Sequence, residues 1–177
     1  MKSCLIAKTN YIDLGGLFHM TKKQLKLDNK FKKINKIAIL GCGSTPGITN
    51  IIASYGSSLL KYVNEIHISF GDYDKTKYNQ PFVLPYTMQT LFDEFMLKPA
   101  LLKNRKLIFV EPRSGEKIIE FPKPVKKLKG FYTLHSELAT FPSSFNLKEC
   151  SFRVTFPEDF SNKIKFKSFN FLKKNLN

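Results

Sequence analysis

The sequence has no tryptophan, little arginine and few cysteines, and these scarcities argue against several classes of protein. Only three of its 29 basic residues are Arg, namely Arg105, Arg113 and Arg153, although the net charge is +15 over 177 residues. Proteins that read base sequence rely on Arg for bidentate contacts and gather their charge on one face. The Lys residues here are scattered beside abundant Asn, Ile and Phe, as in proteins encoded by AT-rich genomes. A basic nucleic-acid-binding protein is therefore the least favoured interpretation.

Cysteine chemistry and membrane insertion have as little support. Cys4, Cys42 and Cys150 are widely spaced, and they form neither a C-x-x-C pair nor a Cys/His pair at zinc spacing. They indicate reduced thiols in a cytoplasmic protein and no metal site. No apolar run approaches the roughly 18 residues that a membrane helix needs, and no signal peptide follows Met1. The 42% hydrophobic content instead predicts a packed core.

Residues 36–50 are the most informative stretch, because they read as a short strand, a glycine-rich turn and the start of a helix. Enzymes of the α/β class bind ligands at such a place. Gly41 and Gly43 would fit a G-x-G-x-x-G fingerprint, but Pro46 occupies the third glycine position, and no Gly-Lys-Ser/Thr follows. The amides after Pro46 are expected to face an anion. Gly43, Pro46 and Gly47 are thus the candidate cofactor-binding residues, the alternative being a tight connection without a ligand.

The first part of the chain, residues 1–63, predicts a β-α-β-α series from a Rossmann-type parallel sheet. Strands are expected at 11–14 and 36–40, and a helix from Thr21 to about residue 33, with Gln24 closing a capping box. The helix that follows the second strand should bury one apolar face, made of Ile48, Ile51, Ile52, Tyr55 and Leu59. Two parallel strands cannot bury both faces alone and leave open edges. We therefore expect something further to complete this sheet.

Residues 64–165 predict a mostly antiparallel sheet with helices, so the fold class is α/β plus α+β. Alternating strands are expected at 66–70, 106–110, 116–121, 131–135 and 150–156. Thr87 is a candidate N-cap for a helix that ends before Pro99, and on that helix Glu94 is expected at a solvated edge. The remaining residues, 166–177, form a basic tail.

Three separated motifs resemble the saccharopine dehydrogenase family. They are residues 11–19, residues 41–50 and residues 132–137, and the resemblance extends over about residues 3–165. It implies NAD- or NADP-dependent hydride transfer to or from an imine or secondary amine of an amino acid or polyamine, as in lysine metabolism. Such enzymes begin with a Rossmann domain that carries the glycine fingerprint. A second domain supplies substrate contacts and dimerisation.

This chain resembles the middle of such an enzyme and lacks the fingerprint. The resemblance therefore implies a fragment or subunit that binds NAD or NADP only in a complete assembly. Its expected partners are a second copy, bound through the second domain, a separate chain with the missing nucleotide-binding half, and a small amino acid substrate. The alternative is a non-catalytic remnant or a dimerising interaction module.

The candidate catalytic residues are His135 and Glu137, which would share one face of an alternating strand and could handle a proton. The structural alternative is a satisfied polar pair on a sheet. The candidate substrate-binding residues are His19 after the first strand, Thr49 and Tyr132 within the resembling motifs, and Arg113 as a carboxylate clamp.

Overall fold

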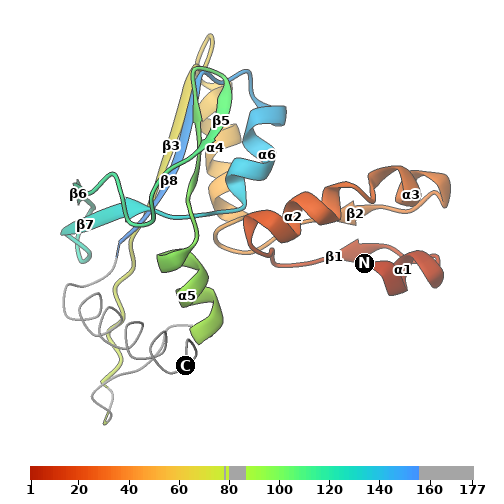
Figure 1. Cartoon of the computed structure of the whole chain (residues 1–177), viewed down its shortest axis with the longest axis horizontal. Coiled ribbons are helices and arrows are strands. Elements are labelled where there is room, and N and C mark those ends of the chain that lie inside the picture. The colour runs from red at the N-terminus through yellow and green to blue at the C-terminus, as the bar shows by residue number, and fades with distance from the viewer. Residues whose placement is uncertain (78, 80–86, 156–177) are drawn as a thin grey trace.

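The computed structural model describes residues 1–77, 79 and 87–155, and the predicted basic tail lies outside them. Figure 1 shows a short parallel sheet with its helices on one side of the molecule and a larger sheet on the other. The first part consists of α1 (Lys2–Ile6), β1 (Tyr11–Ile12), α2 (Phe18–Leu25), α3 (Asp28–Lys33), β2 (Ala38–Ile39) and α4 (Ile48–Ser58). The division of the chain at residue 63 stays a prediction.

The predicted parallel pairing of the first two strands is confirmed, with Tyr11 opposite Ala38 and Ile12 opposite Ile39. The single helix predicted from Thr21 is wrong, because the chain forms α2 and α3 with a break between them. Thr21 lies buried inside α2, and Leu17 precedes that helix without a side-chain cap. Hence no capping box forms.

Asp13 ties together the two turns that follow β1 and β2. Its Oδ1 accepts from the amides of Gly15 (3.0 Å) and Gly41 (2.8 Å), and its Oδ2 accepts from Tyr11 Oη (2.8 Å) and Gln24 Nε2 (2.7 Å). Burial raises the pKa of Asp13, but the hydrogen bonds from Gly41, Tyr11 and Gln24 outweigh it, so the pKa lies below its usual value. Asp13 is therefore a structural anion rather than a ligand contact.

Replacing Asp13 by Ala should destabilise the chain by about 2 kcal/mol, because the donors around it lose a charged acceptor. The measurement is urea unfolding. Asp28→Ala is the control, since Asp28 forms an exposed pair with Lys32 and should matter by less than about 1 kcal/mol. Because the folded pKa of Asp13 is lowered, its stabilisation should be present above pH 3.8 and fade as the pH falls further. Equal losses in the two variants would contradict this role.

The second part is a six-stranded sheet with helices, which confirms the mostly antiparallel prediction. Its elements are β3 (Glu65–Phe70), α5 (Met88–Met96), β4 (Ala100–Lys103), β5 (Lys106–Phe109), β6 (Lys117–Glu120), β7 (Lys127–Tyr132), α6 (Glu137–Ser144) and β8 (Glu149–Thr155). Five strands run antiparallel in the order β5-β4-β8-β7-β6, and β3 pairs with β8 in parallel. The sequence did not indicate β4 or α6, and the strand predicted at 131–135 ends at Tyr132.

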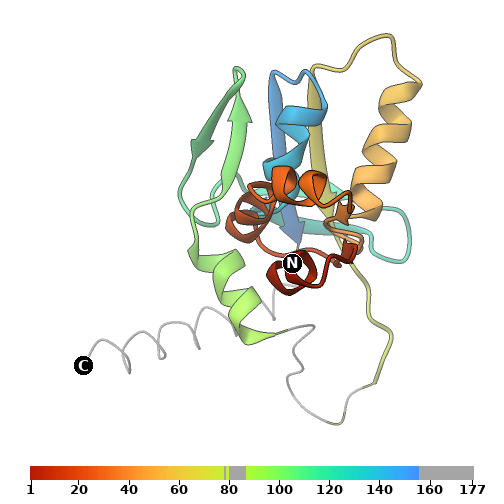
Figure 2. The same cartoon turned by 90° about the vertical axis from the view of Figure 1, so that its right-hand side faces the viewer.

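The core lies on one face of this sheet, beneath α4 and α6. Figure 2 shows both helices on the same side of β8 as α1 to α3. Phe152 of β8, Leu138 and Phe141 of α6, and Phe18 of α2 are all buried there. The core thus joins the two parts of the chain.

Helix α4 is turned the opposite way from the prediction. Its apolar residues Ile48, Ile51, Ile52, Tyr55 and Leu59 are between 56% and 70% exposed. Its inward face carries small side chains, with Ala53 packed against the core. The predicted apolar face therefore exists, but no described residue covers it. Along the described residues, no helix has the length and apolar character to cross a membrane.

Candidate functional site

The glycines of the two strand-to-helix turns make room for one proline ring. A Cβ on Gly15 would lie 2.7 Å from Pro46 Cγ, and a Cβ on Gly41 would lie 2.9 Å from the same atom. Both glycines also have positive φ, 109° and 71°. The glycine-rich sequence is thus explained by close packing of Pro46 against both turns.

The amides at the start of α4 are already hydrogen-bonded within the chain. Gly47 N donates to Asn50 Oδ1 (3.0 Å), Ile48 N to Gly43 O (2.9 Å) and Thr49 N to Ser44 O (3.2 Å). The expectation that these amides face an anion is therefore wrong. Any cofactor contact by Gly43, Pro46 or Gly47 stays a prediction and would have to use other atoms.

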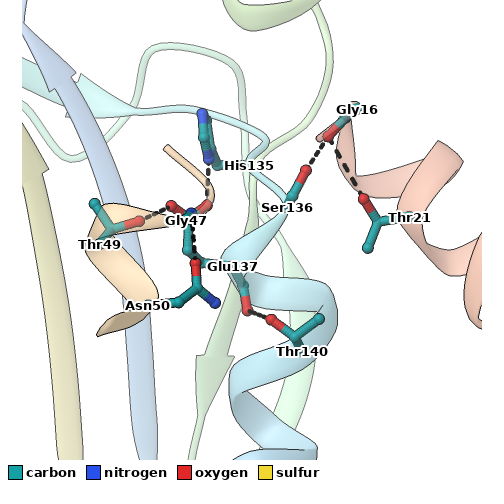
Figure 3. A network of polar contacts seen from close by, with 9 residues as sticks. All are labelled: Gly16, Thr21, Gly47, Thr49, Asn50, His135, Ser136, Glu137 and Thr140. Carbon is teal, nitrogen blue, oxygen red and sulfur yellow. Dashed lines mark hydrogen bonds and ion pairs between the residues drawn. The ribbon is translucent and has the colours of Figure 1, made fainter. Parts of the chain in front are cut away.

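His135 and Glu137 come together at the start of α6 and not on a strand. The chain leaves β7 at Tyr132, and Glu137 is the first residue of α6, so the predicted strand alternation is wrong. His135 Nδ1 is nevertheless hydrogen-bonded to Glu137 Oε2. Thr49 Oγ1 donates to Glu137 Oε1 at 2.6 Å. Figure 3 shows this row of hydrogen bonds, in which the Glu137 carboxylate links Thr49 of α4 to His135.

Glu137 is fully buried, and its surroundings keep it ionised. Burial raises its pKa, but the hydrogen bond and charge of His135 and the hydroxyl of Thr49 outweigh burial, so the pKa lies below the usual value. An ionised acceptor holds the proton of His135 on Nδ1. Burial, followed by the charge of Glu137, raises the pKa of Cys150 to about 12, so this thiol is no nucleophile.

The second ring nitrogen of His135, Nε2, ends the hydrogen-bonded row formed by Thr49, Glu137 and His135. Its ring stacks on Phe152, with the centroids 3.8 Å apart and the planes inclined by 8°. Nε2 points away from Glu137, as Figure 3 shows, and no group among the described residues bonds to it. Ser136 Oγ donates to Gly16 O, which attaches the same segment to the turn after β1. The fixed ring can therefore accept or donate a proton at Nε2.

His135 lines a cleft of about 330 Å³ between the two parts of the chain. Its walls are formed by Leu14, Gly15, Gly16, Leu17, Thr45, Pro46, Phe70, Thr90, Glu94, His135, Ser136, Phe152 and Val154. Glu94 is only 6% exposed, so the expected solvated edge is wrong. Glu94 shares the cleft wall with residues from distant parts of the chain, which the helical pattern of α5 does not show.

The other candidate substrate residues lie away from this cleft. His19 is exposed, and its ring meets that of its neighbour Phe18 edge-on. Tyr132 Oη accepts from Arg153 Nη2 at 2.6 Å, and the Arg153 guanidinium lies 4.0 Å from the Tyr132 ring centroid. Arg113 lies over two aromatic rings of the core region. Of this group only Thr49 contacts the His135 row.

Comparisons with known proteins identify relatives that are much longer than this chain. No family model matches it. It is 25% identical over 174 residues to the carboxyaminopropylagmatine dehydrogenase of Synechocystis sp. (strain ATCC 27184 / PCC 6803 / Kazusa), covering 93% of this chain and 43% of that enzyme. Its fold is similar to that of apo histidine-tagged saccharopine dehydrogenase (L-Glu forming) from Saccharomyces cerevisiae, with a TM-score of 0.62 and 12% identity.

That structural match covers 93% of this chain and 38% of the yeast enzyme, so the chain spans less than half of either relative. Both relatives are dehydrogenases by name, the first matched in sequence and the second in fold. The predicted resemblance to the saccharopine dehydrogenase family is thereby confirmed: the chain is similar to part of one such dehydrogenase in sequence and to part of another in fold.

Proposed function

We propose that this chain supplies the substrate side of an oxidoreductase that transfers hydride between NAD or NADP and an imine or secondary amine. The row Thr49–Glu137–His135, which ends on the cleft, carries this proposal. Reduction of an imine requires one proton at or near the nitrogen, and a positioned histidine is suited to deliver it. Glu137 orients His135, and the Phe152 ring fixes its plane.

The described residues do not fit a nicotinamide nucleotide by themselves. The amides of Gly47, Ile48 and Thr49 are bonded within the chain and do not point to a pyrophosphate, and the sequence has no glycine fingerprint. A bound nicotinamide would supply the hydride. We expect it to be held mainly by other parts of the assembly.

The exposed apolar side chains support a partner that completes the parallel sheet. Ile12, Leu14, Ile37 and Ile39, on or beside β1 and β2, are each more than half exposed, as is the apolar face of α4. Large exposed apolar patches mark interfaces. We propose that a nucleotide-binding half, on the same or another chain, covers them. Dimerisation through the larger sheet is proposed from the resemblance alone.

The test is to co-express the chain with the part of the Synechocystis enzyme that it does not match. NAD(P)⁺ reduction is then followed with carboxyaminopropylagmatine or saccharopine. Activity of the pair, with no NAD(P)H binding by the chain alone, is expected. A stable pair that is inactive with every substrate and cofactor would favour the non-catalytic module. Tight NAD(P)H binding by the chain alone would contradict the proposal that the nucleotide-binding half lies outside this chain.

His135→Gln should lower kcat of the active pair about 10²-fold, because the proton donor is lost while the ring's place stays filled. His67→Gln is the matched control, since His67 lies on β3, bonded to Ser151, and does not line the cleft. Steady-state kinetics and thermal unfolding are measured for both. If His135→Gln retains full kcat, His135 has no part in the reaction.

A further inference from the structure

Three metal-ligating side chains come together on the larger sheet, outside the cleft. They are Glu65 and His67 of β3 and Glu149 of β8, and their ligand atoms all lie within 4.8 Å of one another. We propose that this cluster is a Zn²⁺ site that clips the start of β3 to the start of β8. The proposal goes beyond the proposed dehydrogenase function and does not depend on it.

The parallel pairing of β3 and β8 brings the two carboxylates side by side. Glu65 is opposite Glu149 in the register, and each is the first residue of its strand. Figures 1 and 2 both show the two strands as neighbours. His67 comes two residues after Glu65 on the same strand, so both side chains leave the sheet on one face.

That face is the one turned away from the cleft. On β3, Ile66 and Ile68 alternate with the ligands and pack against the core. Phe70 of β3 and Phe152 of β8 follow the same alternation and line the cleft wall. A bound ion would therefore lie across the sheet from the His135 row.

The imidazole of His67 is held in the orientation that a metal ligand needs. Its Nδ1 is hydrogen-bonded to Ser151 Oγ at 2.8 Å, and Ser151 is only 3% exposed. Its Nε2 lies 3.3 Å from Glu65 Oε2. In metal sites the second nitrogen of a ligating histidine is usually anchored in this way, which fixes the ring while the first nitrogen faces the ion. The Ser151 hydroxyl can accept the Nδ1 proton, which leaves the Nε2 lone pair for the ion.

The charges at the cluster also favour a cation. Like charges directly opposite each other on neighbouring strands are unfavourable. Glu65 and Glu149 nevertheless face each other, and among the described residues neither forms an ion pair with Lys or Arg, although the sequence has 29 basic residues. A divalent ion would neutralise both carboxylates.

The donor set and its spacing suit Zn²⁺. One imidazole and two carboxylates form a three-ligand site that leaves a further position for water. Zinc bonds of about 2.0–2.2 Å place neighbouring ligand atoms roughly 3.4 Å apart in a tetrahedron. His67 and Glu65 already have this spacing, at 3.3 Å, and rotation of the Glu149 side chain closes the rest. Cysteine and histidine spacing in the sequence gave no sign of the site, because the pairing of distant strands creates it.

The experiment is titration of the whole, reduced chain with Co²⁺ as a spectroscopic probe and with Zn²⁺ in competition with a chromophoric chelator. We expect one ion per chain, with visible bands of nitrogen and oxygen ligation and without the thiolate charge-transfer band that Cys4 or Cys42 would give. The chain has three His residues, and Co²⁺ should broaden the NMR signals of His67 first. A thiolate band, earlier broadening of His135, or no saturable binding would overturn the proposal.

Glu149→Gln should weaken Co²⁺ and Zn²⁺ binding about 10-fold or more, because losing a ligand should cost at least as much as losing an outer hydrogen-bond partner of a metal site. Glu116→Gln is the matched control. Glu116 is an exposed carboxylate paired with Lys129, so its replacement changes the net charge equally outside the cluster. Equal losses in the two variants would reduce the effect to net charge and contradict the site.

Discussion

Gly47→Ala is expected to destabilise the chain by about 3–5 kcal/mol, the range of severe backbone strain and overlap. Gly47 precedes α4 with φ 137° and ψ −86°, a conformation that L residues avoid. A Cβ at this position would lie 2.0 Å from the carbonyl oxygen of Gly43 and 2.6 Å from its nitrogen. Both atoms belong to the backbone, so no side-chain rotation can relieve the overlap.

The same substitution should also disturb the His135 row. The bond from Ile48 N to Gly43 O would have to open, and Thr49, the next residue, would lose its position against Glu137. We therefore expect Gly47→Ala to lower the activity of the co-expressed pair as well as the stability of the chain.

Gly56→Ala provides the control within the same helix. A Cβ at Gly56 meets no atom within 4 Å, so the substitution should stabilise the chain by about 0.5–1 kcal/mol through helix propensity. Urea unfolding of both variants gives the comparison. Similar stability of the two variants would show that the tight turn at Gly43 and Gly47 does not hold α4 in place.

Glu137→Ala is the second substitution with a large expected effect, a loss of about 3–4 kcal/mol. Glu137 is fully buried, and its removal leaves the Thr49 hydroxyl and His135 Nδ1 without their acceptor, beside a cavity. Thr140→Ala serves as a control on the same helix, because its hydroxyl donates to the Glu137 backbone carbonyl at 3.3 Å and does not contact the Glu137 carboxylate among the described residues. A loss below about 1 kcal/mol for Glu137→Ala would mean that the row is not a structural unit.

Glu137→Gln isolates the charge, since it keeps the shape of the side chain. The folded pKa of Glu137 is lowered, so its charge contributes stability that is fully present above the ordinary glutamate pKa of 4.5. That contribution is lost as the pH falls through the folded pKa. The stability difference between wild type and Glu137→Gln should therefore be constant near neutral pH and shrink below pH 4.5. A stability difference that grows on acidification would show that the folded pKa of Glu137 is not lowered.

Local sequence signals predicted the helices and strands better than they predicted which distant segments those elements contact. Thr87 caps α5, with Thr90 N donating to its hydroxyl at 3.2 Å, as its residue type suggests. In β8, Cys150, Phe152 and Val154 are buried, as the alternation indicated, but Ser151 and Thr155 of the opposite face are buried as well. Both patterns depend on neighbouring residues in the chain, which a sequence displays directly.

The errors arose where distant segments decide the outcome. The row at Glu137 depends on α4 and α6 meeting 88 residues apart in the chain, which no period reveals. Glu94 is buried on a cleft wall that distant segments form together. Pro46 explains glycines that otherwise suggest a nucleotide fingerprint. The sequence shows the apolar face of α4, but the amphipathic pattern does not say which neighbour that face contacts.

The exposed apolar face of α4 also affects the solubility of the chain when it is produced by itself. Its side chains would be just as exposed in every copy, so colloidal attraction should grow with concentration. The net charge of +15 opposes this at low ionic strength, and added salt removes that protection. If the proposed partner covers α4, the soluble yield of the chain should rise when that partner is produced together with it.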